Sequence, residues 1–435
     1  MPFFKLPLRK PQSSKWTIFF ACATLFMCSQ FFRVSNAVIA PKLQEDLSLS
    51  PQSLGLLGAA FFYSFALMQI PLAFFLDRFG ARWTMAVLSF LSALGAWGFA
   101  LAESFEEAFI GRLLIGIGMA ANLMGPMKLF TQWFSLGEFA TLSGIMMSMG
   151  TVGNMLATTP LAFMEKVFGW RTTFFLIGCL TAGLTLVFFF LVRERPEKTG
   201  TSISPSITRP PSSVKQMIFL LRSRSYWVIS YGTFFRYGTL VGIQGLWAGP
   251  YLIQVLGFSP VEAGNILLFL NAGLIMGSPV GGWLSDKVFR SRKKVVLFGL
   301  LAMTVTVGLL SFERDQSRML DLVALFALFG CFSGFGTVMY AHIKESMPAD
   351  MTGMALSSVN LFTMLGGAFF QQGLGWVLDS LRQGGASAPS AFRVAFLLCS
   401  LGTASAFCLY LMVKDTRVGT ATGPQRAKTS EENQI

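Results

Sequence analysis

The segment Ala73-Phe-Phe-Leu-Asp77-Arg78-Phe-Gly80-Ala-Arg82 decides the fold, because it is a short charged turn between long apolar stretches and the chain repeats it. The second copy reads Gly282-Trp-Leu-Ser-Asp286-Lys287-Val-Phe-Arg290. In both places a Ser-Pro pair precedes the aspartate, with the proline twenty-six residues before it. A Phe-Phe-Arg triplet comes before each pair, at 31–33 and 234–236. The matched spacing predicts two similar halves in one chain.

The composition excludes a soluble protein. Of the 435 residues, 53% are hydrophobic and 13% are charged, whereas an ordinary soluble domain is about 25% charged. A soluble globule cannot cover that much apolar surface, so the sequence indicates a protein that crosses a membrane many times. The 43 glycines and the helix-length apolar runs favour packed helices over a barrel of alternating strands.

The apolar stretches predict an all-α membrane protein with twelve transmembrane helices in two six-helix halves. A span needs about 20 apolar residues. The predicted spans are 17–40, 52–76, 82–102, 107–131, 138–163, 171–193, 226–253, 261–284, 293–312, 319–343, 350–378 and 392–413. The domains are then an N-terminal half (1–193), a polar linker (194–225), a C-terminal half (226–413) and a tail (414–435). Two parallel repeats of this kind form a transporter architecture with the substrate site between them.

The net charge of +13 is distributed as in a membrane protein. If the N-terminus is cytoplasmic, 23 of the 34 Lys and Arg residues lie in cytoplasmic loops, linker and tails, and 7 lie on the opposite side. This asymmetry follows the positive-inside rule. It predicts an inner-membrane protein with both termini in the cytoplasm, and it explains the basic charge without a nucleic-acid partner.

The remaining composition predicts no cofactor and no metal site. All six cysteines fall inside predicted helices and form no Cys-x-x-Cys motif, so we expect free, packed thiols. The chain has a single histidine, His342. The first residues lack a small-residue cleavage site before position 40, so we expect a cytoplasmic tail rather than a signal peptide.

Both charged turns resemble the G-x-x-x-D-R/K-x-G-x-R/K signature of the major facilitator superfamily. The segment from Arg112 to Gly118 is similar to the R-x-x-x-G-x-G motif of that family. The resemblance implies twelve helices, transport by alternating access, and a cytoplasmic gate in which the acids cap a neighbouring helix and form ion pairs. The implied gate residues are Asp77, Arg78, Arg82, Asp286 and Lys287. The alternative is a set of solvated loop charges of little energetic weight.

The charges inside the predicted spans point to an anionic substrate. None of the 21 Asp and Glu residues lies in the middle of a span, whereas Arg33, Arg112 and Arg236 do, and Lys128 lies toward a cytoplasmic end. Burying an arginine at the bilayer centre costs about 2.5–3.5 kcal/mol. We therefore predict that Arg33 and Arg236, at matching places in the two halves, clamp an anion with their planar forks. Lys128 and Arg112 would add positive potential, although Arg112 also fits a structural role and Lys128 fits snorkelling to the interface.

Several uncharged polar side chains are candidates for the rest of the cavity. Amides in mid-membrane either contact a substrate or join helices together. The candidates are Asn36, Tyr63, Asn122, Gln244, Asn271 and Asn360, with Gln30, Asn154 and Gln371 as further polar residues.

A narrower resemblance concerns the organophosphate antiporters and the anion:cation symporter branch of the superfamily. Phe234-Phe-Arg236-Tyr237-Gly238 is similar to the former, and the helix through Trp133-Phe134 to the latter. The resemblance implies paired cations for phosphates or carboxylates. The chain departs from the symporters at Phe32 and Met119, where they carry acids. This departure favours exchange with a counter-anion, or a substrate that brings its own proton, over a carboxylate relay.

Other function classes fit the sequence less well. An embedded enzyme needs a metal cluster, a nucleophile–base pair or a buried acid, and one histidine with no mid-span acid argues against it. A receptor on a transporter scaffold needs a larger signalling domain, and a cation-exporting drug transporter needs a buried acid. The open alternative is a carrier of nitrate or phosphate. One chain contains both halves, so we expect a monomer.

Overall fold

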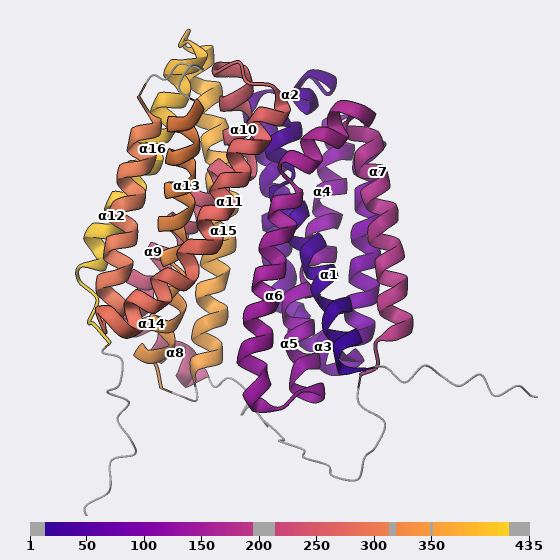
Figure 1. The fold of residues 1–435 in the computed structure, drawn as a ribbon, viewed down its shortest axis with the longest axis vertical. Coiled ribbons are helices and arrows are strands. Elements are labelled where there is room, and N and C mark those ends of the chain that lie inside the picture. Colours follow the sequence, from indigo (N-terminus) through magenta and orange to yellow (C-terminus); the bar gives the residue numbers. More distant parts are fainter. Residues whose placement is uncertain (1–13, 195–213, 313–318, 349–350, 417–435) are drawn as a thin grey trace, which may run out of the picture.

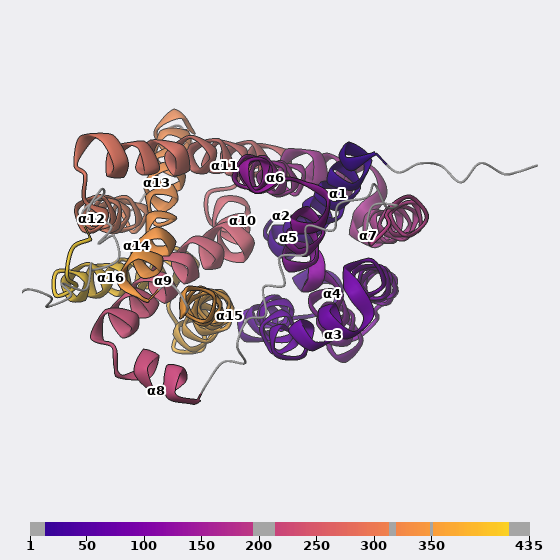
Figure 2. The ribbon, with the colours of Figure 1, turned by 90° about the horizontal axis from the view of Figure 1, so that it is seen from below.

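The computed structural model describes residues 14–194, 214–312, 319–348 and 351–416. Most of the predicted linker and tail therefore lies outside the described residues. The described chain is helical almost throughout, which confirms the predicted fold class. The two predicted halves lie side by side, with the N-terminal half drawn in indigo to magenta and the C-terminal half in pink to yellow (Figures 1 and 2).

The N-terminal half contains seven helices, which make six spans. They are α1 (Lys15–Val34), α2 (Asn36–Asp46), α3 (Pro51–Ala100), α4 (Phe105–Met119), α5 (Ala121–Trp133), α6 (Leu136–Leu156) and α7 (Thr159–Leu191). The helix α3 holds two spans joined by a sharp bend at Gly80, where φ is 79°. A similar bend at Gly169, with φ of 75°, divides α7. Both bends use left-handed backbone that glycine adopts without steric cost.

The C-terminal half follows the same plan, with the interfacial helix α8 (Val214–Arg222) added at its start. The spans are built from α9 (Arg224–Gly242), two π-helical turns (Ile243–Trp247 and Tyr251–Val255) around α10 (Ala248–Pro250), α11 (Pro260–Trp283) with a π-helical turn (Leu284–Val288), α12 (Arg292–Leu310), α13 (Met319–Phe335), α14 (Val338–Ser346), α15 (Thr352–Gln383) and α16 (Ala388–Tyr410).

Twelve spans result from these helices. Within the described residues, nine helical stretches are long and apolar enough to cross a membrane. Two of them are the bent stretches that each hold two spans, and the interrupted segment 224–255 supplies another. The structure differs from the sequence expectation in detail, since the first span breaks at Ser35 and continues to Asp46. Helix α16 also begins at Ala388, because Ser387 caps it with a side-chain hydrogen bond.

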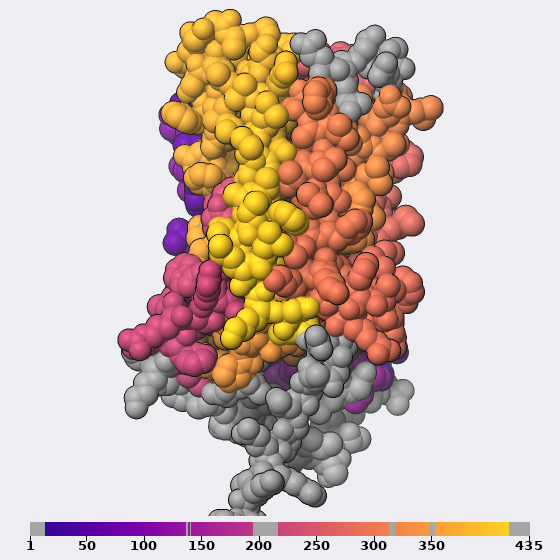
Figure 3. All heavy atoms as spheres, turned by 90° about the vertical axis from the view of Figure 1, so that its left-hand side faces the viewer, coloured from indigo at the N-terminus to yellow at the C-terminus, as the bar shows by residue number. Residues whose placement is uncertain are grey.

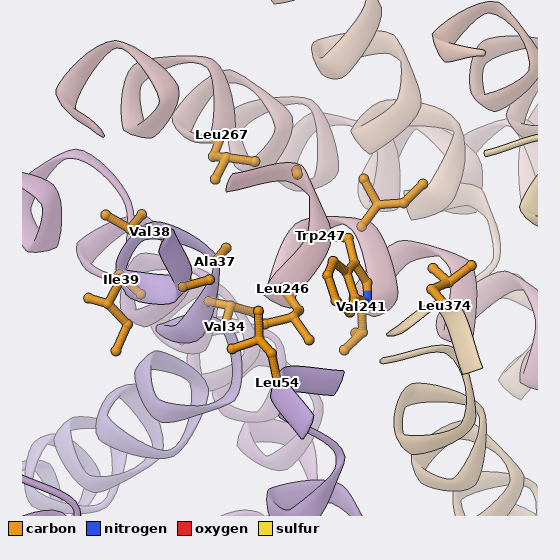
Figure 4. Packing of buried hydrophobic residues seen from close by; sticks show 14 of the residues in the cluster. Val34, Ala37, Val38, Ile39, Leu54, Val241, Leu246, Trp247, Leu267 and Leu374 are labelled. Carbon is orange, nitrogen blue, oxygen red and sulfur yellow. The ribbon is translucent and has the colours of Figure 1, made fainter. Parts of the chain in front are cut away.

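The two halves contact each other on the side away from the start of α1 and the end of α16, which we call the far side; the other is the terminal side. On the far side, Gly249 in α10 packs directly against the backbone carbonyl of Ala37 in α2. Figure 4 shows the hydrophobic core there, where Val34, Val38 and Leu54 of one half approach Leu246 and Trp247 of the other. The core therefore joins both halves, while exposed apolar side chains such as Ile70 and Phe190 face outward.

Candidate functional site

Arg33 lies in the last turn of α1, just before the break at Ser35, and its side chain reaches the other half. It is 9% exposed. One terminal guanidinium nitrogen donates to the hydroxyl of Tyr237 in α9, at 3.0 Å. The guanidinium also lies 4.9 Å from the ring centroid of Phe65, a contact that attracts a cation to the aromatic face. Its Nε is buried and has no partner within the described residues.

Arg236 lies in α9 and is 5% exposed. Its terminal nitrogen donates to the backbone carbonyl of Ser333 in α13, at 3.0 Å. The side chain passes directly over Gly336, at the break between α13 and α14, where a Cβ atom would collide with it. Like that of Arg33, its Nε is buried without a described partner. No described carboxylate forms an ion pair with either arginine, so both are cations held by neutral groups.

Tyr237 connects the two arginines. Its hydroxyl accepts the hydrogen bond from Arg33, and its ring centroid lies 5.8 Å from the guanidinium carbon of Arg236. Tyr340 in α14 interacts electrostatically with both arginines, and its hydroxyl donates to Asn360 at 3.4 Å. The sequence analysis quoted Tyr237 without assigning it a role and missed Tyr340. The adjacency of Tyr237 to Arg236 was the available signal.

The other two predicted cations have different partners. Arg112 in α4 is 1% exposed and donates to the backbone carbonyl of Phe32 at 3.2 Å, which fastens α4 to α1 beside Arg33. Lys128 in α5 donates to Asp77 at 2.8 Å and to the carbonyl of Leu76 at 2.6 Å. Lys128 therefore belongs to the gate turn, and its printed partners are not those of the arginine pair.

The predicted polar residues divide into joined and unjoined side chains. Gln244 donates to Asn271 at 2.7 Å within the C-terminal half. Asn122 accepts from Ser89 at 3.1 Å within the N-terminal half. Tyr63 is different, because its hydroxyl donates across the halves to Gln372 at 2.7 Å.

Asn36 is the unjoined member of this group. It is the first residue of α2 and is 1% exposed. Both atoms of its amide are buried without a partner in the described part of the chain. A buried amide without hydrogen bonds is costly, so Asn36, three residues after Arg33, has unused capacity for a ligand.

The gate residues of the N-terminal half bond within that half. The side chain of Asp77 is 82% exposed and pairs with Lys128. Arg82 donates to the carbonyl of Phe189 at 3.0 and 2.7 Å. The predicted helix cap is made by a different acid: Glu194 accepts the backbone N–H groups of Ala81 and Arg82, each at 2.9 Å.

The gate residues of the C-terminal half do the same. Arg292 pairs with Asp286 and, at 2.8 Å, with Glu345. Arg78 and Lys287 form no described ion pair. All ion pairs in the described ranges lie inside one half, so the terminal side carries no such bond between the halves.

The far side, by contrast, is held by bonds between the halves. Gln254 donates to Gln44 at 3.2 Å, and Thr159 donates to Asn265 at 2.7 Å. A hollow of about 570 Å³ lies outside this contact, lined by residues that include Lys42, Glu165 and Arg382 but neither buried arginine of the pair. The arrangement describes a molecule closed on the far side.

Comparisons with known proteins agree with this architecture. A family model described as Major Facilitator Superfamily matches residues 20–371 and 241–431. A probable sulfoacetate transporter of Cupriavidus necator is 25% identical over 75% of this chain and 79% of that protein. A probable L-galactonate transporter of Escherichia coli is 24% identical over 91% of this chain and 87% of that protein. A hexuronate transporter of Bacillus subtilis is 24% identical over 84% and 86%.

Solved structures show the same fold. A bacterial homolog of the human lysosomal transporter Spinster, in an inward-facing and unoccupied conformation, superposes with a TM-score of 0.77 at 18% identity. The match covers 92% of this chain and 96% of that one. A D-xylose-proton symporter superposes with a TM-score of 0.70 at 16% identity, covering 89% and 97%.

Proposed function

The chain belongs to the Major Facilitator Superfamily, and from this premise we propose that it is a secondary transporter of a small organic anion, a carboxylate or an organophosphate, by alternating access. The observation that carries the proposal is the pair Arg33 and Arg236, one from each half, which share Tyr237 and have no described carboxylate partner. The names of the relatives, which include carriers of sulfoacetate, galactonate and hexuronate, support an organic anion.

The energetic argument is that the substrate supplies the missing negative charge. An arginine in mid-membrane costs about 2.5–3.5 kcal/mol, and neutral partners offset only part of this. An anion between the two forks would accept charge-assisted hydrogen bonds, including those of the unpartnered Nε atoms. Asn36, with its unused amide, would bind a second polar group of the same substrate.

Alternating access would proceed from the conformation described here. The far side is closed by contacts between the halves, so the substrate would exchange through the terminal side. We propose that this side is the cytoplasm and the membrane is the inner membrane, as the distribution of Lys and Arg favours. Asp77 and Asp286, with Arg78, Arg82 and Lys287, would form the gate that closes it.

The coupling partner follows from the composition of the site. Because no described carboxylate pairs with the arginines, we propose that a counter-anion, or a proton carried by the substrate, drives transport. Both halves are in one chain, so the proposed unit is a monomer.

The test is thermal stabilisation of the detergent-purified protein by a panel of carboxylates, sulfonates, organophosphates, nitrate and phosphate, beside neutral and cationic compounds of matched size. We expect stabilisation by one class of organic anion only. The variant Arg33→Gln, Arg236→Gln should fold and lose the effect, while Arg393→Gln, an exposed cation elsewhere, should keep it. Stabilisation by neutral or cationic compounds, or by anions in the double variant, would overturn the proposal. Stabilisation by nitrate or phosphate alone would identify an inorganic-anion carrier.

A further inference from the structure

The C-terminal half carries an apolar groove on its surface, at a distance from the arginine pair. Its volume is about 430 Å³. Its lining is aromatic and aliphatic and includes Trp227, Tyr231 and Phe234 from α9, Phe362 and Leu365 from α15, and Leu409 from α16. Figure 3 shows the segment of α8 and α9, in pink, beside the lower part of α16, in yellow.

The groove exists because α9 and α15 diverge toward the terminal side. They touch at Gly238, where a Cβ atom would lie 2.8 Å from the carbonyl oxygen of Gly366. Nearer the terminal side, bulky rings separate the helices: the rings of Trp227 and Phe362 are 5.9 Å apart. From Phe234 to Trp227 the groove runs about 10 Å along the helix axis, which suits a hydrocarbon chain lying along it.

Positive charge gathers at the mouth of the groove. The indole nitrogen of Trp227 donates to the carbonyl of Leu221 at 2.7 Å, which ties α8 to this end of α9. Arg222 closes α8 and Arg224 opens α9, and both are exposed. Within the described chain neither forms an ion pair with a carboxylate. The exposed apolar side chains of α8, Met217, Ile218 and Phe219, are those of a helix lying in a membrane interface.

We propose that this groove binds an anionic phospholipid, with one acyl chain between α9 and α15 and the phosphate against Arg222 and Arg224. The apolar lining sets the occupant as hydrocarbon, and the two unpaired arginines at the interface set the sign of its headgroup. The site is independent of the proposed transport substrate. Because α9 also carries Arg236, an occupied groove would brace that helix against α15.

The experiment is native mass spectrometry of the detergent-released protein with added phosphatidylglycerol, phosphatidylethanolamine or phosphatidylcholine of identical acyl chains. We expect one tightly held phosphatidylglycerol in the original protein. The double variant Arg222→Gln, Arg224→Gln should bind it about tenfold more weakly, since each interfacial cation contributes to anionic-lipid binding. The matched control is Lys294→Gln, Lys344→Gln, which removes two exposed cations on the same side, on α12 and α14.

A second variant tests the groove itself. Leu365→Trp fills the lined volume without changing charge, so it should lower retention of all three lipids. A brominated acyl chain should quench the fluorescence of Trp227, and the quenching should be absent from Trp227→Phe, which reports occupancy without relying on affinity. Equal retention of the three lipids, unchanged binding in both variants, or a dimer of the chain that excludes lipid would overturn the proposal.

Discussion

Arg33 carries a positive charge in the middle of its span, and a hydroxyl group and two aromatic rings are its described partners. A hydrogen bond to a charged group contributes about 1.5–3 kcal/mol, which is comparable with the cost of placing the charge there. The bond from Arg33 to Tyr237 is therefore a main term in holding the empty site together.

Removing the Tyr237 hydroxyl tests this term. We expect Tyr237→Phe to lower the denaturation temperature in the absence of anion, because Arg33 loses a hydrogen bond of about 1.5–3 kcal/mol. A saturating anion should restore part of the difference, since it gives Arg33 another partner. The measurement is thermal denaturation with and without the anion. Tyr231→Phe is the control, because it loses a bond to Ser405 on the same helix and touches neither arginine. A deficit unchanged by anion would contradict the prediction.

Gly336 is the second residue on which the site depends. Its lack of a side chain makes room for Arg236. We expect Gly336→Ala to weaken anion binding about tenfold, because overpacking of about 1–3 kcal/mol must be relieved by moving Arg236. Isothermal titration of the purified variant measures this. Gly282→Ala is the control, since nothing lies within 4 Å of a Cβ atom there. Equal affinities of the two variants would sink the idea.

At the scale of elements, the first, fourth, seventh and tenth spans are all interrupted. The breaks lie at Ser35, at Ala120, at the π-helical turns that begin at Ile243, and at the turn of Gly336 and Thr337. Broken helices free backbone carbonyls inside the membrane, where buried polar groups need partners. The carbonyls of Phe32 and Ser333 accept hydrogen bonds from Arg112 and Arg236 in this way. The breaks therefore build the polar centre of an otherwise apolar bundle.

The gate turn of α3 leads to a prediction at the same scale. Asp77 is mostly exposed and pairs with Lys128, so Asp77→Asn should change stability little, as is usual for exposed ion pairs. We expect it to shift the balance between the two open states without changing which anions bind. Distances between spin labels on the terminal ends of α5 and α14 measure the balance. Asp321→Asn, an exposed acid on the other side, should leave these distances unchanged; an altered anion preference in Asp77→Asn would count against the gate role.

At the scale of the molecule, the two halves are rigid bodies whose described mutual bonds cluster on the far side. The hydrophobic core there includes residues of both halves, whereas the gate clusters are each contained in one half. Opening the far side must therefore separate apolar surface and break the bond between Gln44 and Gln254.

A disulfide across that bond tests the motion. In a background with the exposed Cys179 and Cys408 replaced by serine, Gln44→Cys with Gln254→Cys should cross-link under oxidation. Transport into vesicles should then stop while anion binding from the terminal side persists, because only the far side is locked. Reduction should restore transport, and each single variant should be unaffected by oxidation. Full transport by the cross-linked protein would exclude this opening movement.

The sequence alone determined the fold class, the two repeats and the cations inside the spans. These depend on hydropathy and spacing, which report whether a residue lies in the membrane whatever its neighbours are. Asp77 and Asp286 were located by their repeated position, and Arg33 and Arg236 by their matching places in the halves.

Only the tertiary structure decided which of these residues share partners. It joined Arg33 to Tyr237, Lys128 to Asp77 and Arg112 to the Phe32 carbonyl. It also assigned the helix cap to Glu194 and left Asn36 without a partner. Partners depend on how each helix is rotated and where it breaks, and these follow from packing between segments more than a hundred residues apart, as with the 204 residues between Arg33 and Tyr237. Hydropathy carries no record of that rotation.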